Sequence, residues 1–120
     1  MKILVKRVYD PPSRDDGRRL LVDRIWPRGL SKDSARLDAW VKDFAPSTEL
    51  RKWFAHDPAK WTEFQHRYFA ELDKKPDLKK TILPPKTQGK VTLLFGAKDV
   101  EHNNAVALKN YLQHHPSRGK

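Results

Sequence analysis

Residues 23–29 (DRIWPRG) place two arginines around a tryptophan directly after an acidic residue. Arg24 and Arg28 flank Trp26, and each guanidinium can donate paired hydrogen bonds to a phosphate or a carboxylate without losing its proton. This pattern predicts an anion-binding loop. An alternative from the same residues is that one arginine pairs with Asp23 and braces the loop, and the two arrangements can coexist.

Two residues of this loop constrain its backbone. Pro27 fixes its own φ, and Gly29 permits a positive φ, so we expect a turn of defined shape and not a linker. The loop follows the continuous apolar run 20–22 (LLV), which is typical of a strand buried on both faces. We therefore predict a preorganised site directly after a buried strand.

A second loop with polar chemistry follows the apolar run 91–95, which is interpreted as another strand ended by Gly96. The last helix is predicted from about residue 101 to 113, and its unpaired amides and positive dipole end would attract an anion. The expected ligand-binding residues of the two loops are Arg24, Trp26, Arg28, Gly29, Gly96, His102 and Asn103.

Three groups in these loops can carry or orient a proton, namely Asp23, Asp99 and His102. For Asp99 the alternative is a helix cap, and for His102 it is a plain surface histidine. Whether the protein is an enzyme stays open at this stage. If it is one, the residues favour electrostatic stabilisation of a developing anion over covalent catalysis.

The order of the elements predicts an α/β fold, with a small, mostly parallel sheet of about three strands flanked by helices. The strands are expected near residues 3–8, 20–22 and 91–95, and the direction of the first strand stays open. If the second and third strands are parallel, both polar loops emerge at one edge of the sheet, where such sheets bind ligands.

The helices are placed by capping residues and by apolar spacing. Ser47 is expected to cap a short helix, and Asp57 with Pro58 is expected to begin a longer helix over 59–72. This helix junction explains His56 beside Asp57 better than a proton-transfer dyad does. Residues 37–44 fit either a helical turn or an extended piece, and residues 10–18 are expected to form a turn without a helix. We expect a single domain over 1–115 and a flexible tail over 116–120.

The chain carries 25 Lys and Arg against 15 Asp and Glu, which gives a formal net charge of +10. This excess favours an anionic small molecule or a nucleic acid as partner. A nucleic-acid-binding or transcription-regulatory protein is therefore the alternative function, although no helix-turn-helix, winged-helix or RNP pattern occurs. Acidic residues interrupt every basic run, so an ordinary solvated surface also explains the charge.

Several classes of protein are disfavoured by what the sequence lacks. Without cysteine there is no disulfide, thiolate nucleophile or cysteine-ligated metal, and His56 and His102 have no ligand spacing, so we expect no metal and no cofactor. No apolar run reaches the length of about 18 residues that a membrane span needs. A cytoplasmic location is the expectation, no membrane partner is expected, and the oligomeric state stays open.

The segments KRVYDPP, LLVDRIWPRGLSKD, APSTELRKWFAHDP and TLLFGAKDVEHNNAVALK together resemble the YeaO-like family of the domain-of-unknown-function 488 superfamily. The resemblance covers nearly the whole chain and implies a compact bacterial α/β domain, with no particular activity. Relatives in the broader superfamily look similar at the acidic residue, arginine and proline that match Asp23, Arg24 and Pro27. They tend to place cysteines where this chain has Gly96 and residues 102–104, so no thiol chemistry carries over.

Overall fold

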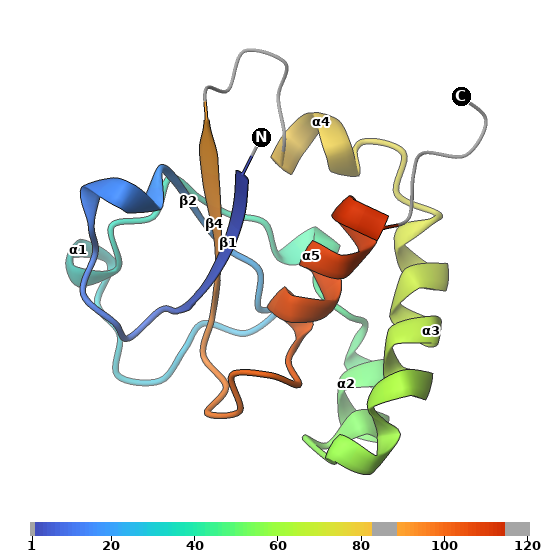
Figure 1. Ribbon diagram of the computed structural model, residues 1–120. Coiled ribbons are helices and arrows are strands. Elements are labelled where there is room, and N and C mark those ends of the chain that lie inside the picture. The colour runs from blue at the N-terminus through green and yellow to red at the C-terminus, as the bar shows by residue number, and fades with distance from the viewer. Residues whose placement is uncertain (1, 83–88, 115–120) are drawn as a thin grey trace.

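The computed structural model describes residues 2–82 and 89–114 and shows a four-stranded sheet with helices packed against it (Figure 1). All strand pairs are parallel, and the order in the sheet is β1-β4-β2-β3. The strands are β1 (Lys2–Arg7), β2 (Arg18–Leu21), β3 (Ala39–Trp40) and β4 (Lys90–Phe95). The predicted α/β class is confirmed, and the sheet has one strand more than the three expected.

Strand β4 lies inside the sheet and pairs with β1 on one side and with β2 on the other. Leu93, for example, lies opposite both Val5 and Leu20. Residues 91–95 are all buried, as expected for a parallel strand that is covered on both faces. The direction of the first strand, which the sequence left open, is parallel to β4.

Helices cover the two faces of the sheet unequally (Figure 1). The short helix α1 (Lys32–Ala35) lies on one side, and the larger helices lie on the other. Those helices are α2 (Thr48–Phe54), α3 (Trp61–Leu72), α4 (Leu78–Ile82) and α5 (Asn104–His114). Short 3₁₀ helices occur at Arg14–Asp16, Lys42–Phe44 and Pro58–Lys60.

The predicted caps form, and they explain where the helices begin. The Ser47 hydroxyl accepts a hydrogen bond from the Leu50 amide at 3.1 Å, so α2 begins at the predicted place. The Asp57 carboxylate accepts from the Ala59 amide, but the turn that it starts is 3₁₀, and the α-helix follows at residue 61. Helix α5 begins at residue 104 and not near 101, because the side chain of Asn103 accepts from the Val106 amide.

In two further segments the structure adds detail that the sequence left open or did not predict. The ambiguous stretch 37–44 contains both an extended piece, β3, and a 3₁₀ turn. The turn over residues 10–18 includes a short 3₁₀ helix that Ser13 and Asp16 hold through reciprocal side-chain-to-backbone hydrogen bonds. The expected tail, 116–120, lies outside the described residues.

The main core lies between the sheet and the larger helices. Phe64, Tyr68 and Leu72 form the buried stripe of α3, and Phe54 of α2 stacks on Phe64 with ring centroids 4.2 Å apart. On the other face, a smaller cluster around Leu21 is covered by the loop side chains Trp26, Leu30 and Leu37 and by Trp40 of β3. Within residues 2–82 and 89–114, no helix is long and apolar enough to cross a membrane.

A basic cleft at the carboxyl edge of the sheet

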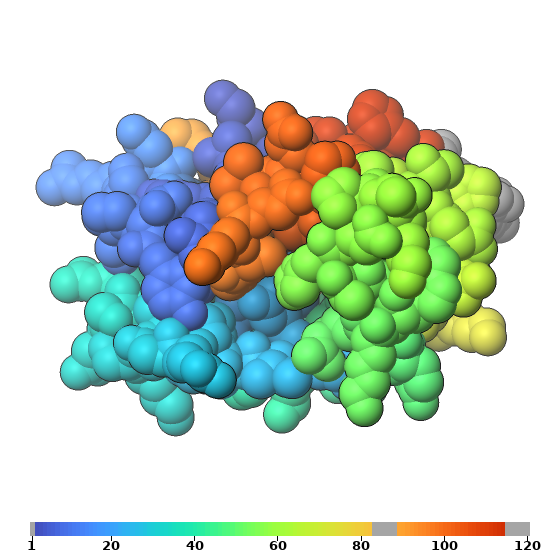
Figure 2. Space-filling model, turned by 90° about the horizontal axis from the view of Figure 1, so that it is seen from below, coloured from blue at the N-terminus to red at the C-terminus, as the bar shows by residue number. Residues whose placement is uncertain are grey.

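A cleft of about 730 Å³ opens at the edge where the parallel strands end, and Figure 2 shows this hollow from below. Every strand contributes to it through the segment that follows: Tyr9 after β1, residues 23–28 after β2, Pro46 after β3 and residues 96–97 after β4. The wall opposite residues 23–28 comes from the end of α2 and the residues beyond it, namely Arg51, Lys52, Phe54, Ala55 and His56. The expected meeting of the loops after the second strand and β4 is therefore present.

The loop 23–29 is fixed by aromatic side chains that donate hydrogen bonds to backbone carbonyls. The donors are Trp40 to Asp23 (2.7 Å), Trp26 to Leu30 (2.8 Å) and Tyr9 to Arg28 (2.7 Å). Gly29 has φ of +75° in the turn between Pro27 and Leu30, as its residue type predicts. The backbone of this loop is consequently held in one shape.

Asp23 joins the two loops across the cleft. Its carboxylate accepts from the Gly96 amide at 2.9 Å and from the side-chain amide of Asn104 at 3.1 Å. Burial raises the pKa of Asp23 above its ordinary value, although both hydrogen bonds and the charges of Arg51 and His56 act in the opposite direction. Gly96 permits this contact, since a Cβ there would lie 3.1 Å from the carboxylate oxygen.

Arg24 lines the cleft and holds the chain segment that leads into α2. Its guanidinium donates to the backbone carbonyl of Pro46 at 2.9 Å and to that of Ala45 at 3.4 Å, just before α2. Among the described residues, neither Arg24 nor Arg28 forms an ion pair with Asp23. Arg24 thus braces backbone carbonyls instead of the carboxylate, and some of its five N–H donors remain for a ligand.

The other predicted residues of the first loop divide between the cleft and its surroundings. Trp26 and Arg28 line the cleft, and the Arg28 side chain is exposed. Gly29 is exposed and is not among the lining residues, so its part is to shape the turn. Gly96 lines the cleft through its backbone.

His102 and Asp99 lie beside the cleft but do not line it. The His102 Nδ1 is 3.0 Å from the Asp99 carboxylate, and its ring packs edge-on against Trp61. Asp99 also accepts from the amides of Glu101 and His102, and these hydrogen bonds lower its pKa. Asp99 therefore caps the turn before α5.

Asn103 lines the cleft, but its side chain is used within the fold. It accepts from the Val106 amide at 2.9 Å and donates to the Asp99 carbonyl at 2.9 Å. These caps already satisfy amides around the start of α5. The helix N-terminus therefore has fewer free N–H donors for an anion than the sequence predicted. The positive charge of the cleft comes from elsewhere.

Sequence reasoning missed the basic residues contributed by α2. Leu50 and Phe54 are four positions apart and face the core, so Arg51 and Lys52 project away from it and are exposed beside the cleft. That spacing was a usable signal, but α2 could not be placed at this edge without the unrecognised strand β3. His56 also lines the cleft, and its backbone has φ of +57°, directly after Ala55 with +48°.

The lining of the cleft carries an excess of positive charge. The basic groups Arg24, Arg28, Arg51 and Lys52 line the space together with His56, and Asp23 is the single acidic residue among the described residues of the lining. The rings of Tyr9 and Trp26 supply apolar surface, whereas Phe54 and Phe64 reach the cleft only from the core. Within the described parts of the chain, no group of three or more His, Asp or Glu side chains is arranged to hold a metal ion.

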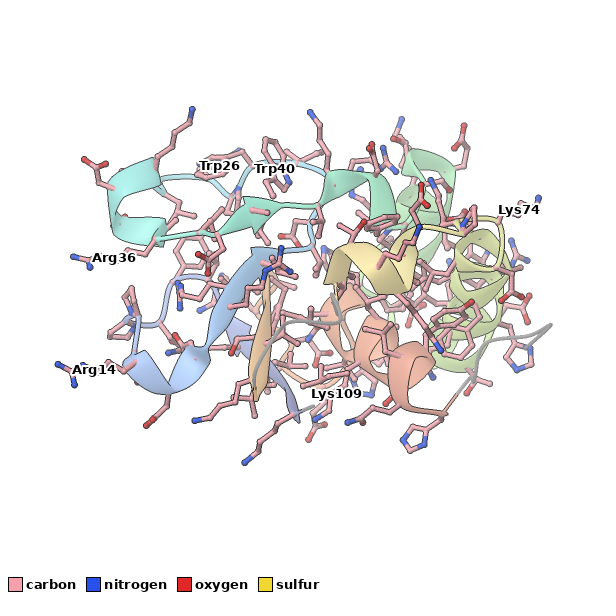
Figure 3. All side chains as sticks on the ribbon, turned by 90° about the horizontal axis from the view of Figure 1, so that it is seen from above. Arg14, Trp26, Arg36, Trp40, Lys74 and Lys109 are labelled. Atoms are coloured by element: carbon pink, nitrogen blue, oxygen red, sulfur yellow. The ribbon has the colours of Figure 1, made fainter. Side chains whose placement is uncertain are left out.

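Basic side chains outside the cleft are spread around the molecule. Figure 3 shows Arg14 and Arg36 at one end, Lys74 toward the other and Lys109 on a further side. A nucleic-acid-binding surface would need such groups along one face. The nucleic-acid alternative stays a prediction, checked by measuring whether oligonucleotide binding falls steeply between two salt concentrations.

The fold and the cleft define a small parallel α/β domain with a basic cavity at the carboxyl ends of its strands. A family model described as "Inactive DUF488-N3 subclade" matches residues 2–120. The chain belongs to this YeaO-like family of the DUF488 superfamily.

Similar proteins cover most or part of the chain. It is 42% identical over 113 residues to the uncharacterized protein YeaO of Escherichia coli. The aligned region covers 94% of this chain and 98% of that protein. It is also 52% identical over 71 residues to the uncharacterized proteins Mb3100c of Mycobacterium bovis and Rv3073c of Mycobacterium tuberculosis, over 59% of this chain and 60% of each relative. No solved structure matches the chain.

Proposed function

We propose that this protein binds an anionic, phosphate-bearing small molecule in the basic cleft. The observation that carries the proposal is the convergence of Arg24, Arg28, Arg51 and Lys52 on one cavity in which Asp23 is the single opposing charge among the residues that the structure describes. Arg28, Arg51 and Lys52 are exposed and can move to meet a phosphate, while the half-buried Arg24 is fixed against the Pro46 carbonyl before α2. Hydrogen bonds between guanidinium groups and phosphate oxygens are among the stronger polar contacts in proteins.

The size and lining of the cleft indicate a ligand larger than the phosphate group alone. A volume of about 730 Å³ falls within the range of roughly 300–1,000 Å³ typical of small-molecule sites. Tyr9, which is 43% exposed, and the half-buried Trp26 provide apolar surface that a free inorganic ion would not use. We therefore expect an organic phosphate, with an apolar or aromatic body, to bind more tightly than inorganic phosphate.

Binding without catalysis is the form of the proposal that the family supports. The subclade whose model matches the chain is described as inactive. The cleft contains no cysteine, and His102, the histidine expected to carry a proton, packs outside the lining. A sensing or carrier role for an organic phosphate is consistent with these features.

The proposal is tested by calorimetric titration with phenyl phosphate at low salt. In an Arg28→Gln, Arg51→Gln double variant we expect affinity to fall by about 100-fold, because each charged hydrogen bond contributes roughly 1.5 kcal/mol or more. A matched control, Arg14→Gln with Lys74→Gln, removes the same net charge from side chains that point away from the molecule (Figure 3). Equal affinity in the two double variants would show that phenyl phosphate does not bind through the cations of the cleft, which would contradict the proposal.

A further inference from the structure

Asp23 occupies an unusual position for a carboxylate in an anion-binding cleft. It lies among the basic lining residues, yet within the described residues no lysine or arginine forms a salt bridge with it. Its hydrogen-bond partners are the backbone amide of Gly96 and the side-chain amide of Asn104, and both are neutral donors. The negative charge of Asp23 is therefore not cancelled by direct contact with a cation.

The carboxylate also keeps acceptor capacity on the side of the cleft. An ionised carboxylate has about four acceptor sites on its two oxygens. One contact to each oxygen is accounted for, since Gly96 donates to Oδ2 and Asn104 to Oδ1. These two contacts fix the orientation of the carboxylate and leave acceptor sites for a bound molecule.

The cleft is thus arranged in two parts. Arg28, Arg51 and Lys52 form an exposed basic rim, whereas Asp23 lies partly buried where the ends of β2 and β4 meet. Phe54 and Phe64 also line this space, but they belong to the core and are only 5% and 2% exposed. A molecule that fills this space can contact both the exposed cations and the Asp23 carboxylate.

We propose that the cleft selects a bipolar ligand, an organic phosphate that also carries an amine or another N–H donor directed at Asp23. This inference rests on the proposed function and adds the chemistry of the second ligand end. Asp23 would act as the specificity-determining residue, because an ammonium group in a net-positive cleft is repelled unless a carboxylate receives it. A phosphate without a donor would bind more weakly, since Asp23 would then lose water without gaining a partner.

A pair of ligands that differ only in the donor tests this selection. We expect wild-type protein to bind 4-(2-aminoethyl)phenyl phosphate about tenfold more tightly than 4-ethylphenyl phosphate in calorimetric titrations at low salt. In Asp23→Asn the ratio of the two affinities should fall to about one or below. The control Asp15→Asn removes the same charge from a side chain that is 91% exposed, and it should keep the preference.

The outcomes separate this inference from the proposed function. If wild-type protein binds both phosphates equally, or Asp23→Asn keeps the preference, the role of Asp23 is overturned while anion binding stands. If neither phosphate binds, the proposed function fails and this inference fails with it. Should Asp23→Asn not fold, the ratio measured on wild-type protein decides by itself.

Discussion

The two walls of the cleft are built in contrasting ways. Residues 23–29 are held by three aromatic hydrogen-bond donors and by the contact between Asp23 and Gly96. The opposite wall, residues 51–56, presents exposed Arg51 and Lys52 and ends in two residues with positive φ. The first wall supplies shape and the second supplies much of the mobile positive charge, and a binding site needs both.

The contrast predicts that substitutions in the two walls are separable. Changes to the side chains that hold residues 23–29 should lower stability, and changes to exposed cations of residues 51–56 should alter ligand binding alone. Surface substitutions away from special features usually change stability by less than about 0.5 kcal/mol.

The largest expected effect is that of Trp40→Ala. The change removes the donor to the Asp23 carbonyl and the edge contact with Trp26, whose ring centroid is 5.3 Å away. Because Trp40 is half-buried, we expect a loss of about 2–4 kcal/mol in the free energy of unfolding. Urea denaturation measures it, with Lys52→Ala as the control expected to stay within about 0.5 kcal/mol. Comparable losses in both variants would contradict the contrast between the walls.

A smaller loss is expected from Gly96→Ala. The new Cβ would lie 3.1 Å from the Asp23 carboxylate and 3.5 Å from Pro27, so the two loops would have to separate slightly. We expect a cost of about 1–2 kcal/mol, measured by denaturation. In an Asp23→Ala background the same change should cost less, since the nearest atom is gone. Strict additivity of the two changes would show that the contact between residue 96 and Asp23 does not set the distance between the two loops.

A gain in stability is expected from Ala55→Gly in the second wall. Ala55 ends α2 in a left-handed conformation with φ of +48°, which glycine adopts without steric cost. After the added backbone entropy of glycine is subtracted, about 0.5–1 kcal/mol of stabilisation should remain, seen as a rise in the midpoint of thermal unfolding. A decrease would mean that the left-handed turn carries no strain.

The smallest effect concerns two acidic residues with opposite pKa shifts. Burial raises the pKa of Asp23 in the folded state, so its protonated form favours folding, and this contribution is lost as the pH rises through the folded pKa. Burial also disfavours the charge of Asp16, but hydrogen bonds from Ser13, Lys6 and Arg19 lower its pKa overall. Its contribution is present above the ordinary pKa and is lost as the pH falls.

Denaturation curves of Asp23→Asn and Asp16→Asn across acidic pH check these signs. Relative to wild type, the stability of Asp23→Asn should rise with increasing pH, whereas that of Asp16→Asn should fall. The same slope in both variants would show that the two carboxylates have similar environments.

The sequence was most informative where chemistry is local. The Ser47 and Asp57 caps, the apolar stripe of α3 and the turn at Gly29 each depend on a few neighbouring residues, and all are present. The long apolar runs likewise predicted β2 and β4, and with them the shared edge of the sheet.

The parts that could not be predicted depend on contacts distant in sequence. Strand β3 has two residues, too few for an alternating pattern, and it exists because Ala39 and Trp40 pair with β2. Without β3, the charged end of α2 could not be assigned to the cleft. The position of His102 was missed for a similar reason, because its ring packs on Trp61, which lies 41 positions earlier in the chain.

The central claim is that an organic phosphate binds between the two walls. The most direct measurement is a titration of ¹⁵N-labelled protein with phenyl phosphate, followed by the shifts of backbone amide signals. The account predicts saturable shifts concentrated in residues 23–28, 51–56 and 96–97. Shifts of similar size around Arg14, Arg36, Lys74 and Lys109, or none in the cleft at millimolar phosphate, would contradict it.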